Sequence, residues 1–79
     1  MNYEVKTFET EGANKRVGFM VDDDGKMFAI DKLVPITDGK TDESYLQDAL
    51  TAAQSEIDSW AADSAVIGKK WNPNTNSFI

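Results

Sequence analysis

The dipeptide Asp24-Gly25, set between two alternating apolar runs, is the feature that most restricts how this chain can fold. A tight primed turn requires positive φ at both central residues, which glycine adopts freely and aspartate tolerates, so the pair predicts a β-hairpin. With this turn, Asp23 faces Lys26, and a slip of one residue would scatter the apolar side chains over both faces. The predicted register gathers five of them on one face: Val17, Phe19, Val21, Phe28 and Ile30.

The opposite face of the same hairpin is neither clearly polar nor clearly core. It carries Gly18, Met20, Asp22, Met27, Ala29, Asp31 and Leu33. A single helix covers one face of a sheet, so these residues are exposed, covered by the C-terminal segment, or buried in a partner. Methionine adapts well to contacts, and a domain of 79 residues has a thin core of its own. Met20, Met27, Ala29 and Leu33 are therefore a candidate self-association face.

Residues 41–68 contain six acidic residues and no basic residue, and they account for the whole net charge of −6. The same stretch has the clearest helical periodicity of the chain. Its apolar stripe consists of Leu46, Leu50, Ala53, Ile57 and Trp60, widened by Tyr45, Ala49 and Ala61. Thr41 can cap the N-terminus, and Asp42 and Glu43 suit the positive end of the helix dipole. The pattern predicts a helix from Asp42 to about Ala62.

The acidic helix has two interpretations. It can be a solvated face that keeps a small protein dissolved, or it can dock a basic partner, even in imitation of a nucleic acid. The candidate docking residues are Asp48, Glu56 and Asp58.

The remaining segments complete a single domain over residues 1–79. Tyr3 and Val5 alternate with charged neighbours, which predicts a first strand over about residues 2–10. Trp71 and Phe78 flank an Asn-Pro-Asn turn and are a candidate aromatic anchor for a partner, with packing as the alternative. We expect an α+β fold: a three-stranded antiparallel meander packed by one long amphipathic helix, with a C-terminal extended segment returning to the sheet.

Composition excludes several kinds of site. The chain has no histidine and no cysteine, so Ser-His-Asp, Cys-His and the usual zinc sites cannot form. The sequence Gly39-Lys40-Thr41 lacks the upstream glycine of a phosphate-binding loop, because position 34 is Val34. The run Asp22-Asp23-Asp24 lacks the spacing of an EF-hand loop, and whether Asp22 and Asp24 share an ion is left open. We expect no enzyme, no cofactor and no metal site.

Charge and hydropathy also indicate a class of partner. An acidic chain without clustered basic residues is not typical of proteins that bind nucleic-acid backbone directly. No apolar run approaches the roughly 20 residues of a membrane span, and the first residues look like a strand and not a signal peptide. We expect a cytoplasmic protein with a protein partner.

The C-terminal sequence Gly68-Lys69-Lys70-Trp71-Asn72-Pro73-Asn74-Thr75-Asn76-Ser77-Phe78 resembles the endings of small proteins from tailed bacteriophages, those of marine cyanophages included. Those endings combine Trp, Asn or Asp, Pro, a spacer, Thr and a terminal aromatic residue. The resemblance implies a phage-encoded virion component or an accessory factor that acts on the host. It carries over no functional residue.

These observations favour a non-catalytic interaction or assembly module that forms homo-oligomers, a dimer in the first instance. The alternative is an acidic inhibitor or nucleic-acid mimic that binds a basic partner through the helix.

Overall fold

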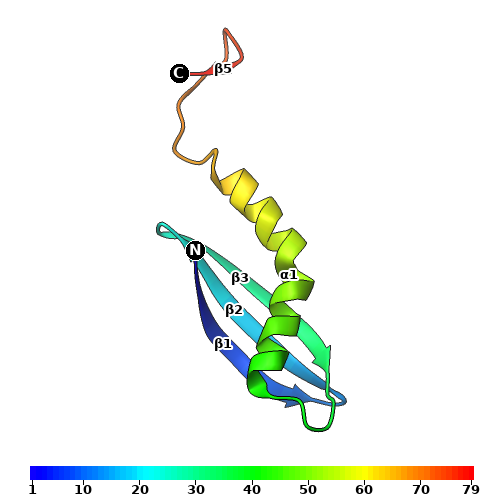
Figure 1. Cartoon of the computed structure of the whole chain (residues 1–79). Helices are drawn as coiled ribbons and strands as arrows, with labels where there is room; N and C mark the ends of the chain where they lie inside the picture. Colours follow the sequence, from blue (N-terminus) through cyan, green and yellow to red (C-terminus); the bar gives the residue numbers. More distant parts are fainter.

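The computed structural model describes all 79 residues, Met1–Ile79. Three long antiparallel strands form a meander in the order β1-β2-β3, and one helix packs on it (Figure 1). The elements are β1 (Asn2–Glu11), β2 (Asn14–Asp23), β3 (Lys26–Pro35), α1 (Asp42–Ser64), β4 (Trp71–Asn72) and β5 (Ser77–Phe78). The predicted α+β class and the meander packed by one helix are confirmed.

The Asp24-Gly25 hairpin forms in the predicted register. Asp24 and Gly25 have φ values of 53° and 86°, as a primed turn requires. Asp23 pairs with Lys26, and Phe19 pairs with Ile30 eleven residues later in the chain. The Asp22 carboxylate accepts a hydrogen bond of 2.9 Å from the Gly25 backbone N–H, which stabilises the turn from within.

The hydrophobic core lies between α1 and the apolar face of β2 and β3. Its members are Val17, Phe19, Val21, Ile30, Val34, Tyr45, Ala49, Ala53 and Ile57. The four sheet positions of the predicted apolar face that lie furthest inside, Val17, Phe19, Val21 and Ile30, are all buried. Phe28 is half-buried and stacks on Trp60 at the edge of the core, with ring centroids 5.4 Å apart.

The residues of α1 that are most deeply buried are not the ones predicted to lie at the centre of its apolar stripe. The residues that face the sheet recur every four positions, as Tyr45, Ala49, Ala53 and Ile57, whereas Leu46 and Leu50 are only half-buried at the margin. Ala49 and Ala53 are completely buried. Their small side chains let the helix backbone approach the sheet closely. The larger leucines then fill the space beside the contact.

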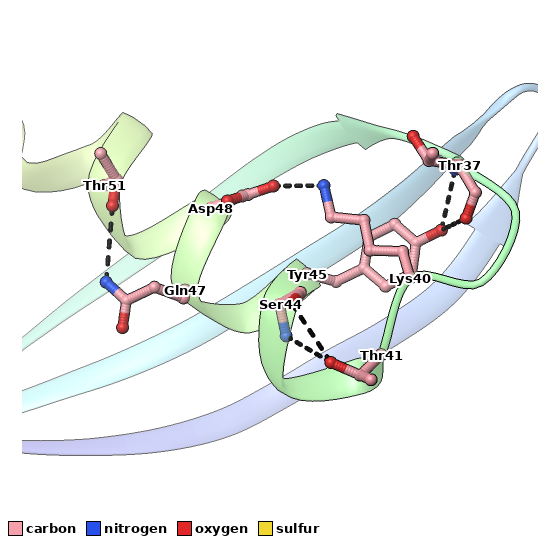
Figure 2. A network of polar contacts seen from close by, with 8 residues as sticks. All are labelled: Thr37, Lys40, Thr41, Ser44, Tyr45, Gln47, Asp48 and Thr51. Atoms are coloured by element: carbon pink, nitrogen blue, oxygen red, sulfur yellow. Dashed lines mark hydrogen bonds and ion pairs between the residues drawn. The ribbon is translucent and has the colours of Figure 1, made fainter.

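The start of α1 is held by hydrogen bonds within its first turn and by hydrogen bonds to the loop that precedes it (Figure 2). The Thr41 hydroxyl accepts a bond of 3.2 Å from the Ser44 backbone N–H, so Thr41 caps the helix as predicted. The buried Tyr45 hydroxyl accepts from the Thr37 N–H at 3.0 Å and donates to the Thr37 carbonyl at 3.2 Å. The loop between β3 and α1 is thereby fixed to the first turn of the helix.

The C-terminal segment does not return to the main sheet, contrary to expectation. Strands β4 and β5 pair only with each other, as a separate two-stranded sheet. Figure 1 shows the reason: α1 continues past the sheet and delivers the chain beyond its end. The helix reaches Ser64, two residues further than predicted, and the molecule is extended, with a longest dimension of 59 Å.

Ile57→Ala tests the packing of α1 on the sheet. Ile57 is 1% exposed, so its truncation should lower the free energy of unfolding by about 2–5 kcal/mol, through lost transfer energy and the cavity left behind. Urea denaturation measures the change. Thr51→Ala on the exposed side of the same helix is the matched control, expected within about 0.5 kcal/mol of the wild type. Equal, small effects of the two substitutions would contradict the packing described here.

Candidate functional site

The face of the main sheet that points away from α1 has no element packed on it (Figure 1). Directly paired residues of antiparallel strands share a face, so the strand register identifies its members. They are Asn2, Glu4, Thr7, Glu9 and Glu11 from β1, Asn14, Arg16, Gly18, Met20 and Asp22 from β2, and Met27, Ala29, Asp31, Leu33 and Pro35 from β3. We call this surface the open face.

The four residues of the predicted self-association face all lie on the open face. Met27 is 60% exposed and Leu33 48% exposed, Ala29 is exposed, and Met20 is half-buried in the middle strand. Met20 and Ala29 form a directly opposed pair across β2 and β3. The strand register thus brings Met20, Met27 and Ala29 together as one apolar area, whereas Asp31 separates Leu33 from Ala29 on the same face of β3.

A shallow hollow of about 220 Å³ lies beside this apolar area, over Gly18. Its lining includes Met20, Ala29, Asp31 and Lys6, the last at the register shift of β1 between Val5 and Thr7. Gly18 is one of its lining residues, and a Cβ there would lie 3.0 Å from the Thr7 Cβ, so a glycine at this position makes room for the Thr7 side chain. The hollow is a place where a protruding side chain of a partner can insert.

The open face is predominantly acidic. Five acids, Glu4, Glu9, Glu11, Asp22 and Asp31, share it with Arg16, and with Lys6 at its edge. The Arg16 guanidinium joins all three strands, because it donates to Glu11 at 2.9 Å and to Asp31 at 3.0 Å. Its hydrogen bond holds the pKa of Glu11 below the ordinary value, and the two carboxylates raise the pKa of Arg16.

The opposite, helix-covered face of the sheet is rich in lysine. Lys15, Lys26 and Lys32 share the side of Val17 and Val34, with Asp23 as the one acid. Each lysine contacts α1: Lys32 pairs with Glu56, Lys26 donates to the Ser64 carbonyl at 2.7 Å, and the Lys15 ammonium lies 5.8 Å from the Tyr45 ring centroid. Basic side chains of the sheet therefore face the acidic helix, and acidic ones face away.

Of the three acids predicted to form a helix docking face, two form ion pairs with lysines of the same chain and one does not. Asp48 forms an ion pair with Lys40 and Glu56 with Lys32, both within this chain (the former in Figure 2). Asp58 lies on the outer side, where its carboxylate accepts a hydrogen bond of 2.9 Å from Gln54. The helix surface thus offers a partner less unpaired charge than its composition indicates.

The predicted aromatic anchor lies on the separate C-terminal hairpin. Trp71 and Phe78 are directly paired across β4 and β5, and each is 53% exposed. The Lys69 ammonium lies over the Phe78 ring, 5.3 Å from its centroid. The two aromatic side chains therefore form one exposed apolar patch next to a positive charge.

A second hollow, of about 450 Å³, lies on the side of α1 next to the stacked rings of Phe28 and Trp60. Glu56 and Asp63 line it together with two serines. No three potential metal ligands come together in the structure. This hollow is wide and shallow, and its carboxylate Glu56 is already paired with Lys32.

Comparison with protein-family models, with curated proteins and with solved structures finds no match. The helix is not apolar enough over a sufficient length to span a membrane. The interpretation of the open face therefore rests on its own residues: an apolar area, a hollow and a surrounding excess of carboxylates, which together form a surface that can contact another molecule.

The separation of charge between the two sheet faces escaped our sequence analysis. Its signal is present in the register, because Arg16 and Asp31 fall on the side of Met20, while Lys32 falls on the side of Val17.

Glu11→Gln tests the pairing that holds the edge strand at the open face. Because the pKa of Glu11 is lowered in the folded protein, the pair should stabilise above the ordinary pKa of 4.5 and lose this effect as the pH falls through the folded value. Urea unfolding of both proteins should show the wild type more stable near neutral pH, with the difference shrinking below about pH 4.5. A difference that is constant down to pH 2 would contradict this role of Glu11.

Proposed function

We propose that this protein is a non-catalytic assembly module that self-associates through the open face. The observation that carries the proposal is the uncovered apolar area of Met20, Met27 and Ala29 beside the hollow over Gly18, with Leu33 exposed further along β3. Exposed, contiguous apolar side chains with a polar rim are typical of protein contact surfaces. Two of the four residues are methionines, whose flexible side chains adapt to a partner surface.

The size of the core supports the same proposal. Only one face of the sheet is packed, and nine apolar residues are buried in a chain of 79. Small domains of this kind gain stability by association, because the apolar side chains of the second sheet face are then buried in the interface.

The alternative, an inhibitor that captures a basic partner through α1, receives less support from the contacts. Two of its three acids, Asp48 and Glu56, are engaged by lysines of the same chain. Charge reversal at Asp48 and Asp58 tests it: under this alternative, capture of a basic partner would be lost and would weaken steeply with salt.

The resemblance of the C-terminal ending to small phage proteins is compatible with an assembly role. On this resemblance alone we propose that the protein is a virion component or an accessory factor, without assigning a role to any particular residue.

The double substitution Met20→Lys with Met27→Lys should abolish self-association, because two charged ammonium groups would have to leave water for an apolar contact. Light scattering over a dilution series gives the solution mass. Val5→Lys, at an exposed position on the other face of the same sheet, is the matched control and should leave the mass unchanged. Circular dichroism verifies that all variants are folded. An oligomer that persists in the folded double variant, or a wild type that is monomeric at every concentration, would refute the proposal.

A further inference from the structure

The charge of the open face limits what can bind there. Two open faces brought together would oppose five acids to five, with only Arg16 and Lys6 of each copy to compensate. Within each copy Arg16 pairs with Glu11 and Asp31, and Lys6 pairs with Glu4 at 3.1 Å, so each face keeps an excess of negative charge, with Glu9 and Asp22 outside any ion pair. Like charges in close apposition oppose association, so a symmetric contact of face on face is disfavoured. The favoured occupant is apolar at its centre and positively charged around it.

One segment of the chain has this chemistry. Residues 65–79 contain Lys69 and Lys70 and no acidic side chain, whereas the rest of the protein is strongly acidic. Next to the lysines stand Trp71 and Phe78, with Ile67 also exposed. Aromatic side chains flanked by cations are typical anchors of protein contacts.

The segment is also available and preformed. It lies beyond the end of α1, away from the sheet (Figure 1). Its hairpin is closed by the β4–β5 pairing and by the Asn72 side chain, which accepts a hydrogen bond of 3.0 Å from the Asn74 N–H. A preformed hairpin loses less conformational freedom on binding than a flexible tail.

We infer that the C-terminal hairpin of one copy, through Trp71 and Phe78 with Lys69 and Lys70, binds the open face of a second copy. This inference rests on the proposed function and names the group that occupies its surface. An aromatic side chain of the hairpin inserts beside Met20 and Ala29 at the hollow over Gly18, and the lysines approach the acids around it. The contact joins two different surfaces, so each copy offers one hairpin and one open face.

A complementation experiment tests the inference. The hairpin variant carries Trp71→Ser with Phe78→Ser, and the face variant carries Met20→Lys with Met27→Lys. Each should be monomeric alone, since the hairpin variant lacks a binding hairpin and the face variant lacks a binding face. Mixed in equal amounts, they retain one intact hairpin and one intact face, and light scattering should show a heterodimer.

The outcomes separate the two proposals. If the hairpin variant alone associates as the wild type does, the open face binds something other than the hairpin, and the inference fails while the proposed function stands. If the face variant alone still associates, or the wild type never does, the proposed function fails. If both variants are monomeric and the mixture is too, one hairpin on one face does not suffice, and the inference is overturned.

Charge substitutions in the hairpin provide an independent test. Lys69→Glu with Lys70→Glu should weaken association about tenfold, because two attractions become repulsions. Lys69→Arg with Lys70→Arg is the matched control and should associate as the wild type does. The wild-type affinity should fall as salt rises, since exposed charges are screened over about 10 Å at 0.1 M. Equal affinity of the two variants at low salt would contradict the charge pairing.

Discussion

The packing of α1 on β2 and β3 is the contact on which the rest of the structure depends. Ala49 and Ala53 bring the helix close to the sheet, and Ile57 with Val17 and Val21 fills the space between them. The buried area is limited, because the helix covers only one side of the meander. A fold with so small a core leaves the second sheet face in contact with water, and any further burial has to come from another molecule.

The same contact organises the charges. An acidic helix lies over a sheet face with three lysines, and Lys32, Lys26 and Lys15 all contact it. Alternation along the strands then leaves most acids of the sheet on the opposite side. The outer surface of the helix keeps four acids without an ion pair, Asp42, Glu43, Asp58 and Asp63, and the open face keeps two, Glu9 and Asp22. The open face differs from the helix in combining its excess of carboxylates with exposed apolar side chains. A basic, aromatic segment at the far end of the same chain is complementary to it.

Local chemistry was sufficient to predict the elements, because each carries its own signal. Asp24-Gly25 determined the turn and with it every pair from Asp23–Lys26 onward, and Thr41 marked the start of the helix. The centre of the buried helix stripe was not predictable in the same way. Hydrophobicity favoured Leu46 and Leu50, but close approach of a helix to a sheet selects small side chains, and only the packed pair of elements reveals that requirement. The return of Trp71 and Phe78 to the sheet was also expected from their hydrophobicity, whereas the direction of α1 takes them away from it.

The sequence by itself determined the hairpin register, the grouping of Met20, Met27, Ala29 and Leu33 on one side, and the exclusion of histidine- and cysteine-based chemistry. These follow from the two-residue period of a strand and from composition, which need no tertiary contact. The tertiary structure alone decided which lysines neutralise the acidic helix, that a hollow opens over Gly18, and that the aromatic hairpin lies apart from the sheet. The hollow forms at the register shift of β1. The other two properties depend on the direction in which α1 crosses the meander, and that direction is set by side-chain packing between elements far apart in the chain.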